Sequence, residues 1–524
     1  MTHAPASSSF VLGLDGIPWN LIDRWIAAGD LPNFERLTQL GAYGPLESTI
    51  PPTTAVAWPS IATGVRADKH GIYGFRRLTP DYRREVNTSA AIEHPTLWDV
   101  SSPAVVVNVP MTYPATPIDG TMITGMMTPN RSNGFTHPPE VAEEIETTVP
   151  DYEIGLAWHE YQDRETDFVD ELTAMVDARR RLMDHLLETR EWSLFFFVYT
   201  APDRLQHLIW DESVIRSHYT QLDQIVGDVL DRIADTDTNL FIVSDHGFGP
   251  VHDHVHINTI LESEGYLKRK GTAGSRGIFE SAGITKTAIR SMLQRTGVEQ
   301  TLLRTLPDSL VEDVARRIPG DHTVYDVDFT ETLAFGFSTR NLYVNDSGRF
   351  VDGPVSPTDR PTVKHELKTI LEDLKHPNSN AQLFRVFDGS ELFPTDPLAP
   401  DLVLEASTGS EIHTALASEI VEPTTTRSGG HRSTGIFFAT GPNIEPGRVS
   451  DATVFDIAPT VLHSQLDAIP RDVDGRVLEI FRSHSPPATE APTYAEYRSR
   501  PGASPTDQDY AVVEDRLRGL GYIE

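Results

Sequence analysis

LFIVSDHGFG, residues Leu240–Gly249, is the stretch that decides the predicted fold. Its apolar start, with β-branched Ile242 and Val243, is typical of a short buried strand. Two glycines then predict a sharp turn, which leaves Asp245 and His246 at the carboxyl end of that strand. Open α/β sheets bind ligands at that end, and carboxylates and imidazoles are common zinc ligands. Taken alone, the pair fits a structural role equally well.

Two earlier apolar runs also end near an acid. The run Ser9–Leu14 predicts the first strand, and Asp15 follows it. The run Ser193–Tyr199 predicts the most hydrophobic strand, and Asp203 and His207 come shortly after it. These two residues are four apart, so one helical turn places both on one face. Asp15 alone would fit a helix cap, but three acids at three strand ends together indicate metal ligands.

A pair of threonines begins another predicted element. Prolines keep the chain extended before it, and Thr53 or Thr54 could be the N-cap of a helix that ends near Gly64. Free backbone N–H groups at such a position suit a phosphoryl group, although a plain cap explains the hydroxyls equally well. Pro59 is expected to kink this helix. For His70, just beyond it, we favour a structural hydrogen bond over a place in the site.

A histidine on a glycine-flanked turn completes the candidates. His431 follows two glycines, which let the backbone approach a ligand closely, and it precedes the predicted strand Gly435–Ala439. It would supply the last imidazole that the set of candidate metal ligands needs. Arg432, beside it, and Asn108, near the end of the predicted strand Ala104–Pro110, are the candidates for binding substrate. For Asn108 we favour the role of a turn residue with satisfied hydrogen bonds over substrate binding.

Alternate histidines follow the opening stretch. His252, His254 and His256 would project the same way from a strand, which would allow a third metal ion. We favour instead a loop at the mouth of the site.

The later chain predicts an insertion and a tail. Weakly apolar helices around Ile278–Arg295 and Thr301–Arg317, and a hairpin-like segment through Leu342–Arg349, predict a cap over the sheet, where specificity is commonly encoded. The core is expected to resume at Asp401–Glu405. The expected division is a discontinuous catalytic α/β core of residues 1–254 and 400–483, an insertion of 255–399, and a C-terminal linker and short helix of 484–524.

Composition excludes several classes of protein. The 524 residues contain no cysteine, so disulfides, thiolate metal sites and cysteine nucleophiles are excluded. The longest apolar runs are too short for a membrane span, and the first nine residues do not resemble a signal peptide, so we expect a cytoplasmic protein. A net charge of −32 repels nucleic acid and anionic membranes. We interpret it as halophilic adaptation to a salt-rich cytoplasm.

In this order, these motifs resemble the type I phosphodiesterase/nucleotide pyrophosphatase branch of the alkaline phosphatase superfamily. Within it, the chain is most similar to the prokaryotic group of predicted phosphohydrolases or phosphomutases. The resemblance covers most of the chain and implies a central, mostly parallel sheet flanked by helices, with an inserted cap. It is carried by these segments: Gly13–Gly16, Thr54–Ile72, Asp203–His207, Ser244–Gly247, His431 and the helix Asp456–Leu462.

The resemblance also implies a ligand set for two divalent ions. One ion would be held by Asp203, His207 and His431, and the other by Asp15, Asp245, His246 and the Thr54 oxygen. Nitrogen and oxygen ligands suit Zn²⁺ and admit Mn²⁺. The sequence departs from the family in two respects. Thr53 adjoins the implied nucleophile Thr54, and the asparagine that nucleotide pyrophosphatases often carry shortly afterwards is missing from Ala55–Trp58.

The expected function is hydrolysis of a small-molecule phosphate ester through a covalent phospho-threonine on Thr54. Two alternatives keep the same metals: a phosphomutase, and a non-catalytic metal-binding protein. A sulfatase is disfavoured because we find no Cys or Ser in the short Pro- and Arg-containing motif that is modified in that class. No motif indicates which ester is used, whether monoesters or diesters are preferred, or the oligomeric state.

Overall fold

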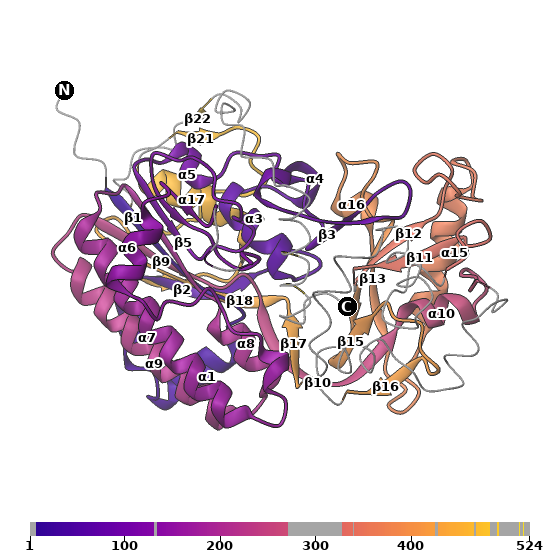
Figure 1. The fold of residues 1–524 in the computed structure, drawn as a ribbon, viewed down its shortest axis with the longest axis horizontal. Helices are drawn as coiled ribbons and strands as arrows, with labels where there is room; N and C mark the ends of the chain where they lie inside the picture. The colour runs from indigo at the N-terminus through magenta and orange to yellow at the C-terminus, as the bar shows by residue number, and fades with distance from the viewer. Residues whose placement is uncertain are drawn as a thin grey trace, which may run out of the picture.

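Ten strands from the part of the chain that the structure describes form the large sheet at the centre of the molecule (Figure 1). The pairs that connect β9, β1, β8, β5 and β6 are parallel, whereas β18 runs antiparallel to both of its neighbours, β2 and β9. The sheet order is β19 (Gly447–Arg448), β2 (Ala42–Glu47), β18 (Thr434–Thr440), β9 (Thr238–Val243), β1 (Ser8–Leu14), β8 (Leu194–Tyr199), β5 (Ala104–Val107), β6 (Gly120–Ile123) and β7 (Thr136–His137), and β20 (Ala452–Thr453) pairs with β2.

The structure is a computed structural model. It describes residues 7–129, 131, 134–270, 327–338, 340–424, 428–465, 468–482, 490–491, 513 and 517.

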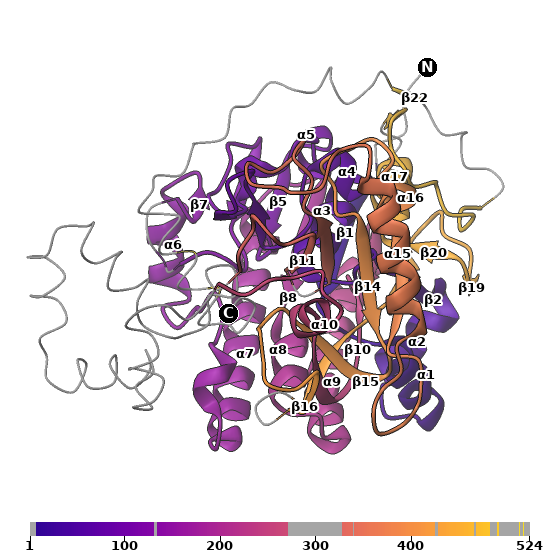
Figure 2. The ribbon, with the colours of Figure 1, turned by 90° about the vertical axis from the view of Figure 1, so that its right-hand side faces the viewer.

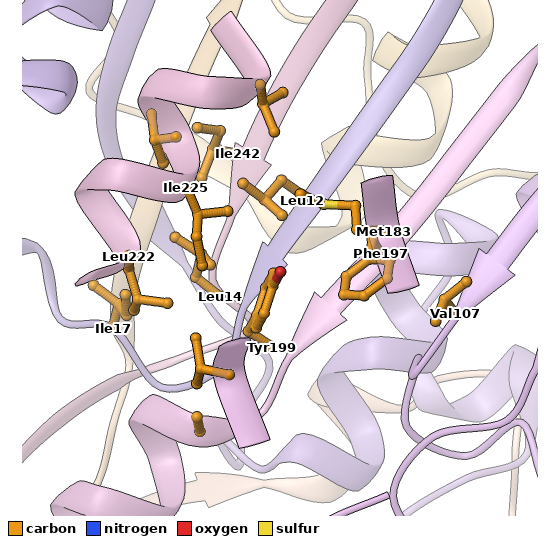
Figure 3. Close-up of a cluster of buried hydrophobic side chains, with 14 of the residues drawn as sticks. Leu12, Leu14, Ile17, Val107, Met183, Phe197, Tyr199, Leu222, Ile225 and Ile242 are labelled. Atoms are coloured by element: carbon orange, nitrogen blue, oxygen red, sulfur yellow. The ribbon is translucent and has the colours of Figure 1, made fainter. Parts of the chain in front are cut away.

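Successive side chains of the central strands enter opposite hydrophobic layers, as the two-residue period of a strand requires. In β8, Phe195, Phe197 and Tyr199 face one layer, and Phe196 and Val198 face the other. Figure 3 shows the first layer, where strand residues such as Leu12 and Phe197 meet Met183 and Leu222 from the covering helices. Both faces are buried, which explains why these strands carry apolar residues on both faces.

Helices cover both faces of the large sheet (Figure 1). One layer contains α1 (Trp19–Ala28), α2 (Pro32–Leu40), α6 (Val141–Thr148), α7 (Glu165–Thr189) and α9 (Glu212–Ile233). The opposite layer contains α3 (Thr54–Thr63), α5 (Leu97–Val100) and α17 (Ile457–Ser464). The predicted fold class, an α/β fold with a mostly parallel central sheet between helices, is confirmed.

A smaller antiparallel sheet follows along the chain. Its order is β11 (Ala334–Phe337), β12 (Asn341–Val344), β14 (Leu402–Ala406) and β13 (Phe384–Asp388), and α15 (Arg360–Asp373) packs against it. Figure 2, turned to this side of the molecule, shows α15 at the front, beside β14.

Two expectations about this region were wrong. The strand expected at Asp401–Glu405 exists as β14, but it pairs with β12 and β13, so the chain does not return to the large sheet there. The reason is that an apolar run carries no information about which sheet it joins. The hairpin expected through Leu342–Arg349 is also different, because β12 pairs with β11 before it and with β14. The helices expected around Ile278–Arg295 and Thr301–Arg317 lie outside the described residues.

The segment expected as a loop at residues 252–256 is a strand. β10 (Gly247–His256) starts immediately after the metal-ligand candidate His246 and is ten residues long. It pairs in turn with β17 (Gly429–Arg432), β15 (Gly409–His413) and β16 (Val421–Pro423). These partners come from distant parts of the chain, which is why the local sequence did not predict the strand.

The tail is described at few positions. β22 (Glu490–Ala491) pairs with β21 (Ile469–Pro470) within the expected linker. Of the helix expected at the end of the chain, the structure describes Val513 and Leu517, which are buried in a cluster with Ala55. Across the described ranges, no helix has the length and apolar character needed to cross a lipid bilayer.

Candidate metal centre and nucleophile

Thr54 is the first residue of helix α3 and is fully buried. Its Oγ1 lies 3.1 Å from His246 Nε2. Thr53 precedes the helix with extended backbone angles, and within the described chain its Oγ1 has no hydrogen-bond partner. The two threonines are adjacent at the start of the helix. The Thr54 hydroxyl is the one that lies beside the His246 imidazole. Pro59 lies inside α3, and the helix continues beyond it to Thr63.

Asp15 follows β1 and is held by α3. The Trp58 indole Nε1–H donates to Asp15 Oδ2 at 3.1 Å. Trp58 is one helical turn after Thr54, so both side chains lie on the same face of α3. The indole lies directly against Gly13, where a Cβ would be only 2.4 Å from the ring. Gly13 is therefore required for α3 to lie close enough to β1 for this contact.

Asp245 and His246 follow β9 in a turn that is fixed by hydrogen bonds. The Gly16 N–H donates to Asp245 Oδ1 at 3.2 Å, and Gly16 has a φ of +74°, which a side chain would strain. The Ile17 N–H donates to Ser244 Oγ, whose hydroxyl donates to the backbone oxygen of His246. The ends of β1 and β9 are thereby tied together, which brings Asp15 close to Asp245.

Asp203, His207 and His431 form a second compact group. Asp203 and His207 lie on α8 (Ala201–Leu208), with His207 Nε2 3.3 Å from Asp203 Oδ1. His431 lies on β17, and its Nε2 is 3.1 Å from Asp203 Oδ1 and 3.1 Å from His207 Nε2. Trp158 stacks on the His207 ring at 5.6 Å between ring centres. The predicted one-turn spacing of Asp203 and His207 is present in the structure.

The three imidazoles each point Nδ1 at a backbone carbonyl. His207 Nδ1 lies 3.2 Å from Gly429 O, His246 Nδ1 lies 3.0 Å from Gly247 O, and His431 Nδ1 lies 3.2 Å from Pro52 O. A carbonyl only accepts, so each Nδ1 carries the hydrogen. In the neutral rings each Nε2 therefore presents a lone pair to the centre of the cluster, as in histidines that bind a metal.

This arrangement places hydrogen-bond acceptor atoms of the imidazoles and carboxylates against one another. In their neutral forms, His207 Nε2 and His431 Nε2 cannot hydrogen-bond across the 3.1 Å between them. Asp15 Oδ1 and Asp245 Oδ2 are buried without a hydrogen-bond partner within the described chain, 3.7 Å and 3.3 Å from His246 Nε2. Two ligands of one tetrahedral zinc ion are about 3.3 Å apart, given bonds of about 2.0–2.1 Å. The residues therefore fit bound cations.

The protonation equilibria of the acids reflect their burial beside one another. Burial and the negative charge of Asp203 raise the pKa of Asp245 to about 8. Burial, Asp245 and Asp203 raise the pKa of Asp15 well above its ordinary value. Burial opposes ionisation of Asp203 as well, but His207 and His431 outweigh it and hold its pKa well below the ordinary range. Burial and His431 lower the pKa of His246, which keeps its ring neutral. Cations would relieve the repulsion between these acids.

The structure thus gathers all seven candidates for metal ligation. Two groups can each hold an ion, and His246 takes part in both: Asp15, Asp245 and His246, and Asp203, His246 and His431. The His246 and His431 rings stack at 3.8 Å between centres. Because Thr54 Oγ1 lies at His246, it faces the junction of the two groups.

The remaining predicted residues have structural contacts. Asn108 has a φ of 59°, and its Oδ1 accepts from the Tyr152 hydroxyl, as expected of a buried turn residue. The Arg432 guanidinium donates to the backbone oxygens of Pro250 and His431, both at 2.8 Å. Substrate binding by Asn108 and Arg432 stays a prediction. His70 makes the structural hydrogen bonds that we favoured: its Nδ1 accepts from the Ile72 N–H, and its Nε2 lies 3.0 Å from Ser60 Oγ.

Sequence reasoning missed the residues that orient the candidate ligands. Trp58 fixes Asp15, Trp158 stacks on His207, and the Gln206 amide donates to Gly16 O at 2.9 Å. The four-residue spacing from Thr54 could have identified Trp58. No comparable signal marks Trp158, because it is far from His207 in sequence.

A family model described as type I phosphodiesterase / nucleotide pyrophosphatase matches residues 10–434. Phosphonoacetate hydrolase from Sinorhizobium meliloti 1021, in complex with phosphonoformate, has a TM-score of 0.57 at 14% identity and covers 88% of this chain and 96% of its own. Murine ectonucleotide pyrophosphatase/phosphodiesterase 5 has a TM-score of 0.50 at 12% identity, with 89% and 97% covered. At such low sequence identity, these two structural matches show a shared fold. None of the curated proteins searched is significantly similar in sequence.

Proposed function

Because the chain belongs to the type I phosphodiesterase/nucleotide pyrophosphatase family, we propose that it hydrolyses small-molecule phosphate esters through a covalent intermediate on Thr54. The observation that carries the proposal is the buried Thr54 hydroxyl, 3.1 Å from His246 at the junction of two clusters of acids and imidazoles. This surrounds one nucleophile with the groups that can activate it.

We assign Asp203, His207 and His431 to one divalent ion. The other would be held by Asp15, Asp245, His246 and Thr54 Oγ1. Zn²⁺ suits these nitrogen and oxygen ligands, and Mn²⁺ is compatible with them. When bound, the ions would supply Lewis-acid stabilisation of the attacking and leaving oxygens and lower the pKa of the Thr54 hydroxyl.

Thr54 Oγ attacks phosphorus in the first step. The Oγ–P bond forms, the P–O bond to the leaving alcohol breaks, and the Thr54 proton is lost to the medium. Val56 and Ala57 donate their backbone N–H groups to Thr53 O, so the N–H groups nearer the start of α3, on Thr54 and Ala55, are assigned to a non-bridging phosphoryl oxygen. Water then cleaves the phospho-threonine, which releases phosphate or a phosphomonoester and restores Thr54.

The chain's own side chains position these groups. Trp58 holds Asp15, and the Gly16 N–H holds Asp245, so both carboxylates stay beside His246. The backbone carbonyls behind His207, His246 and His431 fix the rings with Nε2 directed inward. Since the histidines are occupied in this way, the proposal assigns them no proton transfer.

Two structural relatives support a phosphorus-containing ligand. One solved structure of murine ectonucleotide pyrophosphatase/phosphodiesterase 5 is an inactive variant with a threonine replaced by alanine, in complex with AMP. The phosphonoacetate hydrolase has also been solved in complex with phosphonoacetate. A substrate set for this chain should therefore contain a phosphonate beside phosphate esters.

The test is a panel of model monoesters, diesters and phosphonoacetate, assayed with Zn²⁺ or Mn²⁺ at high salt. We expect metal-dependent release of the alcohol from at least one phosphate ester. Return of the phosphoryl group to the product would instead identify a phosphomutase. Stoichiometric metal binding without turnover of any ester would identify a non-catalytic metal-binding protein, and absence of metal binding would reject the proposal altogether.

A further inference from the structure

A further group of potential metal ligands lies where the strand that leads away from the proposed active site pairs with a neighbouring strand. His254 on β10 and Glu411 and His413 on β15 have ligand atoms that all lie within 4.8 Å of one another. The residues come from segments more than 150 positions apart in sequence, and the pairing of the two strands brings them together. None of the three belongs to the clusters around Thr54.

The register of the strands explains the grouping. In the parallel pair of β10 and β15, His254 lies opposite Glu411, and His256 lies opposite His413. Residues two apart on a strand share a face, and so do residues opposite each other, so all four side chains project from one face. On the other side of β10, Glu422 of β16 lies opposite His254 and approaches His256 Nε2 at 3.6 Å. Two carboxylates and three imidazoles therefore share one face of a three-stranded sheet.

The side chains within this group lie close enough to act together. The His254 and His413 rings stack at 4.0 Å between centres with 21° between their planes. The His256 ring is 5.9 Å from His413. Glu411 is buried, whereas His254 and His413 are half-buried, so the group is open to solvent on the histidine side. A cation can therefore reach it from solvent.

We propose that His254, Glu411 and His413 bind one divalent transition-metal ion, in addition to the two ions assigned to the active site. Two imidazoles and one carboxylate are a ligand set that proteins use for zinc and for iron(II), with further coordination positions left open. Those positions can accept water or an anionic group of a ligand. His256 and Glu422, beside this triad, are the residues placed to orient it.

The two centres are joined by the backbone of β10. His431 lies opposite Phe248 at the start of the strand, and His254 lies six residues further along it. Glu411 Oε1 lies 3.7 Å from the position that a Cβ on Gly430 would occupy, and Gly430 immediately precedes His431. The proposed third ion thus lies against the strand that carries a ligand of the active site. The proposal does not depend on what the active site does.

The test counts metal ions in the full-length protein. Purified protein is stripped with a chelator, reloaded with excess Zn²⁺, freed of unbound ion and analysed by mass spectrometry of the metal. We expect three ions per chain for the wild type and one fewer for His254→Gln and for His413→Gln. The matched control is His376→Gln, because His376 binds Asp253, which points to the opposite face of β10, at 3.2 Å. This control should retain the wild-type count.

Each outcome has a defined meaning. A wild-type count of two that neither His254→Gln nor His413→Gln changes would overturn the third site and leave the proposed function intact. If His254→Gln and His413→Gln each bind one ion fewer than the wild type, the third site is supported, whatever the wild-type count. If the wild type binds only one ion and both variants lose it, the third site is supported and the two active-site ions are rejected. Cobalt(II) absorption of the loaded wild-type protein, with and without Glu411→Gln, provides a readout that does not depend on the histidine variants. Identical spectra would also count against the site.

Discussion

Replacement of Thr54 by alanine should separate chemistry from metal binding. The substitution removes the hydroxyl that lies 3.1 Å from His246 Nε2 and leaves six of the seven proposed ligands in place. The ion at Asp15 and Asp245 loses one oxygen ligand but keeps three side chains, so both active-site ions should remain bound. Turnover requires the missing oxygen and should be lost.

The substitution of Thr54 by alanine should affect activity far more than stability. Within the part of the chain that the structure describes, Thr54 Oγ1 takes part in one hydrogen bond. Its loss therefore costs about 1 kcal/mol of folding free energy, and the better helix propensity of alanine offsets a few tenths of this. Activity should fall by about 10⁴- to 10⁶-fold, as is usual when a nucleophile is removed from a group of residues that act as a unit. Thr54→Ser keeps a hydroxyl at the same position and should retain measurable turnover.

The assay combines steady-state rates, metal content and intact mass. The wild type, quenched with acid during turnover, should gain the mass of one phosphoryl group, and Thr54→Ala should not. Thr53→Ala is the matched control, because the Thr53 hydroxyl has no hydrogen-bond partner within the described chain. It should turn over substrate at close to the wild-type rate. If Thr54→Ala stayed active while Thr53→Ala was inactive, the assignment of the nucleophile would be wrong.

Three further predictions concern the site and the stability of the whole chain. Trp58→Phe removes the indole N–H that binds Asp15, so metal affinity should fall by about 10- to 100-fold in a chelator competition; unchanged affinity would contradict this positioning role. The pKa of Asp245 rises from 3.8 to about 8 on folding, so between these pH values the folded metal-free protein binds more protons there than the unfolded chain. Its free energy of unfolding should therefore fall with rising pH, by up to about 1.4 kcal/mol per unit, and metal should remove this trend in urea titrations. Finally, raising KCl from about 0.1 M to about 1 M shortens the screening length from about 10 Å to about 3 Å, so a chain of net charge −32 should show a higher Tm; a flat or falling Tm would argue against halophilic adaptation.

The sequence predicted the large sheet because its strands are buried on both faces. The run Leu194–Tyr199 is apolar at every position, and Asp203 follows shortly after its carboxyl end. Position along the chain could not reveal which sheet β14 joins, since its first three residues, Leu402–Leu404, are apolar in the same way as a core strand. The family resemblance is confirmed by the match over residues 10–434.

The site could be predicted as a set of residue types but not as a geometry. The spacing of Asp203 and His207 predicted one helical face, which α8 shows. The choice between Thr53 and Thr54 depended on where α3 begins, and a shift of one residue turns the side chain by about 100° around the helix. The segment with alternate histidines from His252 to His256 was predicted as a loop, because the strands that pair with it, β15 and β16, lie more than 150 residues further along the chain. Long-range pairing of this kind leaves no local signal.

The position of β18 has a consequence for synthesis of the protein on the ribosome. β18 fills the gap between β2 and β9, yet about 190 residues separate it from β9 along the chain. At about 5–20 residues per second, translation of that interval takes on the order of 10 to 40 s, during which β9 presents an open edge of hydrogen-bonding groups. His431 emerges just before β18. The nascent chain therefore obtains the last of the proposed imidazole ligands and closes its exposed edge in the same short interval, so the proposed ligand set can be complete only when the sheet itself can close.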